Sequence, residues 1–215
     1  MSETPAEDNA RFWNSFSPRY DRFMARTGGV YAEFLDRLAP DLGRLGSVLE
    51  VATGTGMLAI HLAPSASHVD AVDLAPGMLT RARAKAAARG VNNVDFHLAS
   101  AYELPFEAER FDSAVCANAL HVMQHPERAL AEIRRTCKPG ARLVAPTFCH
   151  GQTLRSRLTS RVLGLSGFRV YHRYTRETLC DLMRQAGLAI VRCDLLPGLF
   201  PLAYVVAQAV ADTPP

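Results

Sequence analysis

Hydrophobic and polar positions follow two alternating patterns along the chain. Short, mostly apolar runs are separated by longer segments in which apolar residues recur every three or four positions. The short runs are typical of strands that are buried on both faces, and the longer segments are typical of amphipathic helices. We predict strands at 47–51, 68–74, 93–98, 111–117, 141–148, 188–196 and 201–210. We predict helices at 8–24, 30–39, about 56–63, 76–90, about 126–137 and 175–187, and a partly helical segment at 151–164.

Residues that are typical of helix ends stand at several of the predicted helix boundaries. Pro76 and Pro126 stand where the first turn of a helix accepts proline, and Thr175 and Gly187 frame a helix as a start and a stop. Strands that alternate with helices indicate an α/β fold in which a parallel sheet is covered on both faces. Ligands of such sheets bind at the carboxyl ends of the strands, so the loops after the first four strands should surround one site.

Composition narrows the class of protein. A chain of 215 residues, with 48% hydrophobic and 21% charged residues, is typical of one soluble globular domain. No apolar run reaches the length of a membrane span, and the polar, acidic start "MSETPAEDNA" is unlike a secretion signal. The five cysteines are widely spaced and form no C-x-x-C pair, which indicates reduced thiols, a cytoplasmic location and no metal site.

The net charge of +3 is concentrated in one segment. Residues 150–176 contain six arginines and no aspartate or glutamate. Such a segment can contact an anionic, partly apolar substrate or an acidic lipid surface, or it can be a solvated basic face. Nucleic acid is not an expected partner, because no recognisable RNA-binding module accompanies the arginines.

The stretch "EVATGTGMLA" at residues 50–59 joins the first strand to a helix. Its glycines permit positive φ angles and the close approach of a ligand, and Gly54 begins a G-x-G-x-x-A dinucleotide pattern. Asp73 stands at the carboxyl end of the second strand, where it can bind ribose hydroxyls or cap the next helix. Glu50 distinguishes between cofactors: a carboxylate repels a pyrophosphate but attracts a cationic group, unless it forms a salt bridge within the protein.

Three longer stretches together carry a family resemblance. "VLEVATGTGMLA", "VDAVDLAPGMLTRARAKA" and the region from "ASAYELPF" to "CKPGARLV" resemble the class I S-adenosylmethionine-dependent methyltransferases, in particular the group that includes ubiquinone/menaquinone-biosynthesis and phospholipid N-methyltransferases. The resemblance covers residues 47–145. It implies a Rossmann-like, doubly wound, seven-stranded sheet, mostly parallel with an antiparallel C-terminal strand, in three α/β/α layers. We expect one domain over 1–215, with an N-terminal helical lid at 1–40 and a basic substrate cover at 148–174.

The resemblance also implies S-adenosyl-L-methionine as the cofactor. Its methionine part would be held around the first loop, by Glu50, Ala52, Thr53, Gly54 and Gly56. Tyr20 would lie over the methionine end, unless it is a core aromatic residue, and Asn118 would line the methyl-transfer region.

The same resemblance assigns the nucleoside end. Asp73 would bind the ribose, Leu74 and Met78 would flank the adenine, and Ser100 and Ala101 would meet the adenine edge. Two positions depart from the pattern of the family. Ala52 replaces the first glycine of the loop, and Ser100 replaces an aspartate that accepts a hydrogen bond from the adenine amino group. A hydroxyl still accepts that bond, but without charge.

Methyl transfer depends mainly on alignment of nucleophile, methyl group and sulfur, and a general base is needed only where the nucleophile keeps its proton. His121 is the base candidate, because it follows Asn118 in the loop after the fourth strand; a structural role for this histidine is the alternative. The expected partner is a small-molecule methyl acceptor: a quinone or phenol, a lipid amine or a natural-product scaffold. A member of the fold that binds the cofactor without methylating, and a nicotinamide-dependent oxidoreductase, are the competing functions.

Overall fold

The computed structural model describes residues 5–25, 29–164, 169–198 and 201–210. Its helices and strands are α1 (Pro5–Ala25), α2 (Gly29–Leu42), β1 (Ser47–Val51), α3 (Met57–Leu62), β2 (His68–Asp73), α4 (Pro76–Ala88), β3 (Val94–Leu98), β4 (Phe111–Val115), the 3-10 helix η1 (Leu120–Val122), α5 (Pro126–Thr136), β5 (Cys137–Phe148), α6 (Leu154–Gly164), α7 (Arg176–Gln185), β6 (Leu188–Leu196) and β7 (Leu202–Ala209). The predicted succession of strands and helices is therefore confirmed.

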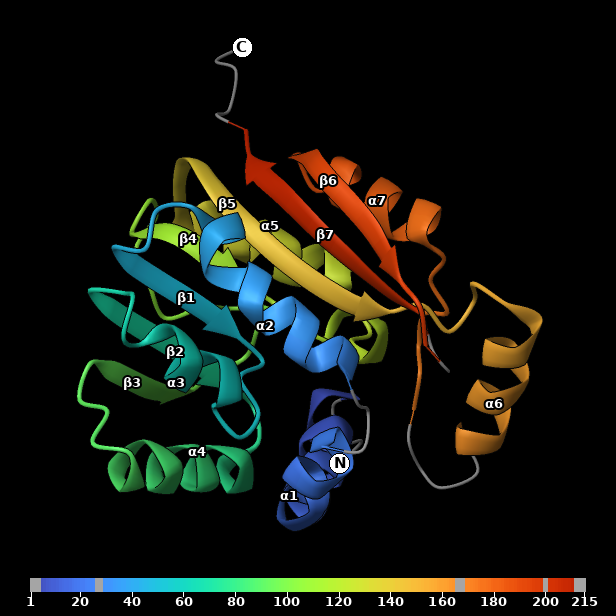
Figure 1. Ribbon diagram of the computed structural model, residues 1–215, viewed down its shortest axis with the longest axis horizontal. Coiled ribbons are helices and arrows are strands. Elements are labelled where there is room, and N and C mark those ends of the chain that lie inside the picture. Colours follow the sequence, from blue (N-terminus) through green and yellow to red (C-terminus); the bar gives the residue numbers. More distant parts are fainter. Residues whose placement is uncertain (1–4, 26–28, 165–168, 199–200, 211–215) are drawn as a thin grey trace.

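One seven-stranded sheet has the order β3-β2-β1-β4-β5-β7-β6 (Figure 1). The pairs from β3 to β5 are parallel, whereas β7 is antiparallel to both of its neighbours. This arrangement confirms the predicted mostly parallel sheet with an antiparallel C-terminal strand. The order reverses between β1 and β4, which is where ligands of doubly wound sheets bind.

Alternate residues of the strands face two separate hydrophobic cores. Val48 of β1 packs with α2 and α3, and its neighbour Leu49 packs with α5 and α7 on the opposite face. Figure 1 shows α2 in front of the sheet and α5 and α7 behind it. Because both faces are covered, the strands are apolar along most of their length, as the sequence indicated.

One predicted boundary is wrong. The strand was predicted at 141–148, after a Lys-Pro-Gly sequence at 138–140 that is typical of a turn, but β5 already begins at Cys137, which pairs with Phe111. The register shifts between Phe111 and Ser113, and Gly140 has a φ of 79°. The turn residues thus form an irregularity inside the strand, because pairing with β4 outweighs their local preference for a turn.

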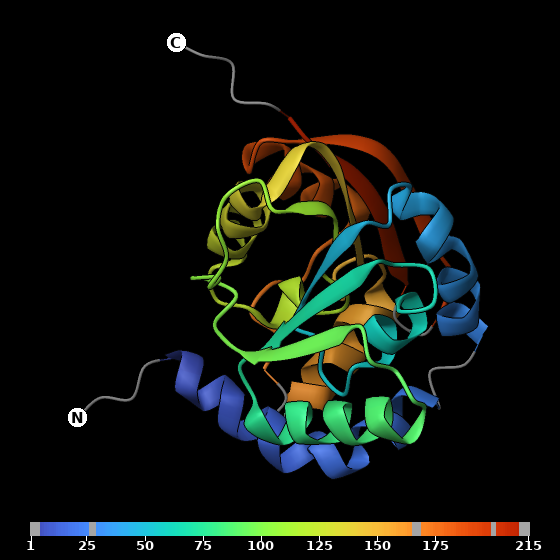
Figure 2. The same ribbon diagram turned by 90° about the vertical axis from the view of Figure 1, so that its left-hand side faces the viewer.

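Helix α1 lies against α4 at the edge of the sheet (Figure 2). Polar contacts hold it there: the Gly77 amide donates to Asn14 Oδ1 at 2.7 Å, and Asp21 Oδ1 accepts from Thr55 Oγ1 at 2.6 Å and from Lys85 Nζ at 2.7 Å. These contacts bring α1 next to the loops that follow β1 and β2. Among the residues that the structure describes, none of the helices has the combined length and hydrophobicity needed to cross a bilayer.

Candidate active site

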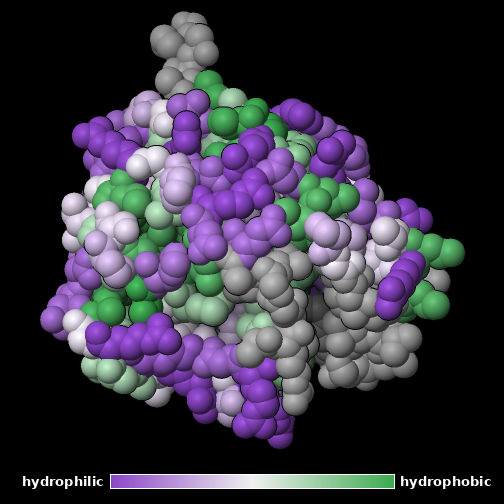
Figure 3. All heavy atoms as spheres, viewed as in Figure 1, coloured by the Kyte–Doolittle hydropathy of each residue, from purple (hydrophilic) through white to green (hydrophobic). Residues whose placement is uncertain are grey.

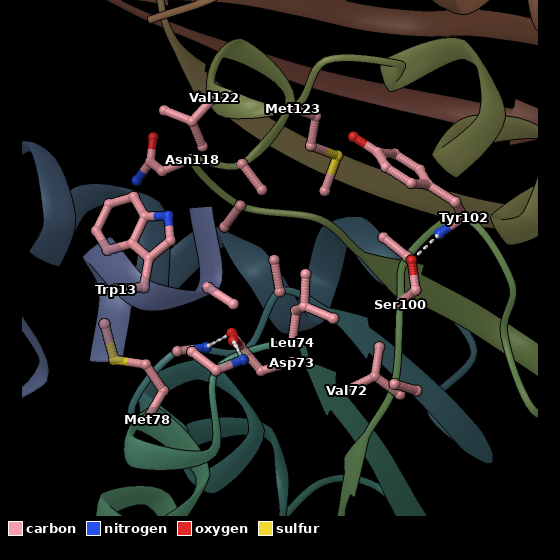
Figure 4. Close-up of a pocket in the computed structure, with 18 of the residues that line it drawn as sticks. Trp13, Val72, Asp73, Leu74, Met78, Ser100, Tyr102, Asn118, Val122 and Met123 are labelled. Carbon is pink, nitrogen blue, oxygen red and sulfur yellow. Dashed lines mark hydrogen bonds between the residues drawn. The ribbon is translucent and has the colours of Figure 1, made fainter. Parts of the chain in front are cut away.

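A pocket opens at the carboxyl ends of the strands on both sides of the switch point (Figure 4). Trp13 and Met78 lie on one side of it in this view, and Ser100 and Tyr102 lie on the other, with Asp73 and Leu74 between them. The lining residues are Ala10, Trp13, Tyr20, Ala52, Gly54, Val72, Asp73, Leu74, Ala75, Met78, Ala99, Ser100, Ala101, Tyr102, Ala117, Asn118, Ala119, Val122, Met123 and Gln124.

The loop after β1 has a backbone that favours glycine at three positions. Ala52, Gly54 and Gly56 have φ angles of 58°, 54° and 75°. A Cβ atom on Gly56 would lie 2.8 Å from Ala82 Cβ and 3.0 Å from the Phe96 ring, so α3 starts close to α4 and β3 only because this residue is glycine. Ala52 stands where the family pattern has a glycine, and its backbone keeps the left-handed conformation that favours glycine.

Asp73 joins the two loops that the sequence assigned to the cofactor. Its Oδ2 accepts from the Gly54 amide at 2.7 Å, and its Oδ1 accepts from the Ala75 amide at 2.9 Å at the start of α4. Burial raises the pKa of this carboxyl group, and its hydrogen bonds to the Ala75, Gly54 and Leu74 amides lower it. Asp73 thus caps the helix start and also lines the pocket, so the two roles foreseen for it are compatible.

Glu50 lies behind the first loop and is outside the pocket lining. Its side chain is buried, and Oε2 accepts from Thr53 Oγ1 at 2.7 Å. Burial raises the pKa of Glu50 to about 8, although the Thr53 hydrogen bond lowers it. The ion pairs found among the described residues include none with Glu50, so the alternative of an internal salt bridge has no support here. A buried carboxylate of this kind is stabilised by a cation.

The loops after β3 and β4 are tied together by Tyr102. Ser100 Oγ accepts from the Tyr102 amide at 3.2 Å, and the Tyr102 hydroxyl accepts from the Gln124 and His125 amides at 3.1 and 3.3 Å. Tyr102 was missed in the sequence, although it directly follows Ala101. Its contacts explain how residues from two separate strands can form one wall of the pocket.

Helix α1 closes the pocket from outside the sheet. A Cβ atom on Gly54 would lie 3.6 Å from the Tyr20 ring, so Tyr20 rests on the first loop. Trp13 also lines the pocket, and its ring meets that of Tyr20 edge-on with centroids 6.1 Å apart. The sequence contained a signal for Trp13, because it lies two helical turns before Tyr20 and so shares its face of the helix.

His121, the base candidate, lies in η1 but is outside the pocket lining. Its ring is buried 5.0 Å from the His150 ring, and the His121 carbonyl accepts from the amides of Tyr171 and His172. Burial, with a further contribution from His150, lowers the pKa of His121 to about 3; burial, with a contribution from Arg173, lowers that of His150 to about 4. Both rings are therefore neutral at physiological pH.

Most of the predicted cofactor residues are brought together. Those that line the pocket are Tyr20, Ala52, Gly54, Asp73, Leu74, Met78, Ser100, Ala101 and Asn118. Those that lie outside the lining are Glu50, Thr53, Gly56 and His121. The larger lining side chains that the sequence did not indicate are Trp13, Val72, Tyr102, Val122, Met123 and Gln124. The last three follow His121 directly, so a reading of the whole loop after the fourth strand would have included them.

Comparisons with known proteins agree with this geometry. Residues 48–140 match a family model described as a methyltransferase domain. The chain is 33% identical over 157 residues to a demethylmenaquinone methyltransferase of Clavibacter sepedonicus, an alignment that covers 69% of this chain and 60% of that protein. Residues 48–140 therefore form a methyltransferase domain of the class I S-adenosylmethionine-dependent type. The resemblance seen in the sequence is thereby confirmed, and S-adenosylmethionine is the cofactor that it indicates.

Solved structures show the same methyltransferase fold. An S-adenosylmethionine-dependent methyltransferase from Aquifex aeolicus has a TM-score of 0.66 and 21% identity, with 83% of this chain and 89% of that chain covered. The cyclase SpnF has a TM-score of 0.69 and 20% identity, with 83% and 80% covered. At these identities the similarity shows the fold alone. The alignment also leaves two fifths of the Clavibacter methyltransferase unmatched, so its activity is not transferred by similarity alone.

Proposed function

We propose that this pocket binds S-adenosylmethionine and that the chain transfers the methyl group to a small, ring-containing acceptor such as a quinol or phenol. The observation that carries the proposal is the convergence of four loops on one pocket. Gly54 follows β1, Asp73 ends β2, Ser100 follows β3 and Asn118 follows β4. A glycine loop, a carboxylate for ribose hydroxyls and a polar adenine edge are the groups that this cofactor requires.

The cofactor residues take the roles that the sequence suggested. The amides of the first loop and Asn118 face the methionine end, Asp73 binds the ribose, and Leu74 and Met78 flank the adenine, which Ser100 and Ala101 meet at its edge. Glu50 acts from behind the loop to which Thr53 and Gly56 belong. Its negative charge attracts the ammonium and sulfonium groups, and these in turn stabilise its ionised form.

The proposal of a ring-containing acceptor rests on the apolar part of the lining. Trp13 and Val122 lie next to Asn118, where the methyl group would point, and Met123 and Tyr102 continue the apolar lining across the pocket (Figure 4). Flat aromatic molecules bury well against such side chains, whereas an amine headgroup finds few anionic partners there. The relatives named as demethylmenaquinone and ubiquinone/menaquinone methyltransferases support this choice. Helix α1 serves as the lid, and the described residues of segment 148–174, which are 148–164 and 169–174, serve as the cover of the acceptor side. Residues 1–4, 26–28 and 165–168 of the expected lid and cover lie outside the described residues.

His121 remains a predicted base, and its surroundings do not favour that role. A general base works best with a pKa near the working pH, and His121 lies behind the pocket wall with a pKa of about 3. A substitution decides the question: His121→Gln should lower turnover far more than cofactor affinity if the ring accepts the proton. Unchanged turnover would leave alignment of the acceptor as the source of catalysis.

Calorimetric titration with S-adenosylhomocysteine, with NAD as the negative control, tests cofactor binding. Asp73→Asn should weaken S-adenosylhomocysteine binding at least about tenfold, because it removes charge-assisted hydrogen bonds. Asp95→Asn is the matched control, since Asp95 is an exposed carboxylate on the neighbouring strand. Equal affinities of the two variants would contradict the assignment of the ribose site.

Turnover with a demethylated naphthoquinol and methyl-labelled S-adenosylmethionine tests the reaction itself. The second candidate function is a repurposed member of the fold that binds the cofactor without methylating; the cyclase SpnF shares the fold and is named for a reaction other than methyl transfer. Tight binding of S-adenosylhomocysteine combined with no methyl transfer to any quinol, phenol or amine would favour this alternative.

A further inference from the structure

Helix α6 turns Ser156 and Ser160 inward and Leu154 and Leu158 outward. Ser156 and Ser160 are 0% and 1% exposed, whereas Leu154 and Leu158 are 83% and 63% exposed. A helix on the surface of a globular protein normally has the reverse arrangement, with its leucines against the core. Leu154 and Leu158 therefore form an apolar patch on the outer face of α6 that the described part of the chain leaves uncovered.

The start of the helix fixes this orientation. The Ser156 amide donates to Thr153 Oγ1 and the Thr153 amide donates to Ser156 Oγ, both at 3.0 Å. This reciprocal cap holds Ser156 against the turn after β5, where its hydroxyl also reaches the His150 carbonyl at 3.3 Å. Since residues four apart share a face, Ser160 follows Ser156 inward and Leu158 follows Leu154 outward. The exposure of the leucines is thus built into the fold.

Arginines flank the two leucines along the chain. Arg155 and Arg157 are exposed on the same helix, and Arg169 and Arg173 are exposed in the segment that follows. Residues 150–176 contain no acidic side chain. Figure 3 shows hydrophobic and strongly hydrophilic residues side by side at the right-hand edge, where Figure 1 places α6. Leucines between arginines complement a layer that is anionic at its surface and apolar just below, which is the structure of an acidic phospholipid leaflet.

We propose that the outer face of α6, formed by Leu154, Arg155, Arg157 and Leu158, binds the protein to the surface of anionic phospholipid membranes. The leucines enter the head-group region and the arginines pair with lipid phosphates. The inference concerns binding alone and does not depend on the proposed methyl transfer.

The binding face is connected to the pocket. The segment after α6 returns to η1, where the Tyr171 and His172 amides donate to the His121 carbonyl and His172 Nε2 lies 3.2 Å from the Gln124 carbonyl. Gln124 lines the pocket, and α6 follows the carboxyl end of β5, on the same side of the sheet as the pocket (Figure 1). Binding through α6 would therefore place the acceptor side of the pocket close to the membrane.

Co-sedimentation with vesicles tests the proposal, using vesicles of phosphatidylcholine alone and of phosphatidylcholine mixed with phosphatidylglycerol. The full chain should bind the mixed vesicles, bind the neutral ones much more weakly, and be released by added salt. The double variant Leu154→Gln/Leu158→Gln should bind the mixed vesicles at least about tenfold more weakly, because the apolar contact is lost. Arg155→Gln should weaken binding about fivefold and reduce its dependence on salt.

Val191→Gln is the matched control. Val191 is 52% exposed on the edge strand β6, so this variant should bind vesicles like the unaltered protein. Unchanged melting temperatures show that the variants fold, which is expected because all the altered side chains are exposed. Absence of binding to the mixed vesicles, equal binding to neutral ones, or full binding by the leucine variant would each overturn the proposal. Binding to RNA that survives the leucine substitutions, without vesicle binding, would assign the arginines to a nucleic acid instead.

Discussion

Ala52 gives the sharpest test of how the cofactor loop is built, because an alanine occupies a backbone conformation suited to glycine. Its φ of 58° lies in the left-handed region, where an L-residue other than glycine is strained by about 1–2 kcal/mol. Ala52→Gly removes this strain. The change also makes the unfolded chain more flexible, at a cost of about 0.5–1 kcal/mol, and loses part of the contact of a half-buried methyl group, worth about 0.4 kcal/mol.

These contributions predict a free energy of unfolding between about 0.4 kcal/mol lower and about 1 kcal/mol higher, and the upper limit is equivalent to a melting temperature about 2–4 °C higher. Urea unfolding monitored by circular dichroism measures it, and S-adenosylhomocysteine should bind with unchanged or slightly improved affinity. Ala84→Gly is the control: Ala84 is exposed in the middle of α4, and the same chemical change there should cost about 1 kcal/mol. Equal destabilisation by the two substitutions would refute the strain argument, and a large loss of cofactor affinity would mean that Ala52 does not belong to the cofactor loop.

Two further predictions concern residues behind the same loop. Burial raises the pKa of Glu50 in the folded state to about 8, above the value of about 4.3 in an unfolded chain. The protonated side chain therefore contributes stability that is fully present below about pH 4.3 and is lost as the pH rises to about 8. The free energy of unfolding of the cofactor-free protein should fall over this range by up to about 1.4 kcal/mol for each pH unit. Glu50→Gln should flatten this decline and weaken cofactor binding, and parallel pH profiles of the urea midpoints of the two proteins would contradict the prediction. Gly56→Ala places a Cβ atom 2.8 Å from Ala82 Cβ at a positive φ, so it should lower the unfolding free energy by about 2 kcal/mol or more; an unaltered urea midpoint would show that α3 can move away from α4 without cost.

The sequence by itself determined the order of strands and helices and the family to which they belong. Hydrophobic periodicity is a local property, and so are the proline, threonine and glycine signals at helix ends. The same holds for the loops that carry Gly54, Asp73 and Ser100, because parallel strands with helical connections always bring their carboxyl ends to one edge of the sheet. The sequence alone is therefore sufficient to assign those residues to one site.

Only the tertiary structure decided which side chains face the pocket. Trp13 and Tyr102 reach it because α1 packs on α4 and because the Tyr102 hydroxyl accepts hydrogen bonds from the loop after β4, and these contacts link positions far apart in the chain. Glu50 and His121 were assigned to the same site, yet neither side chain lines the pocket, since the direction of a side chain depends on local backbone angles and packing. The outward leucines of α6 contradict what periodicity alone would favour. There the cap formed by Thr153 and Ser156 determines the orientation of the helix, and packing against the turn after β5 maintains it.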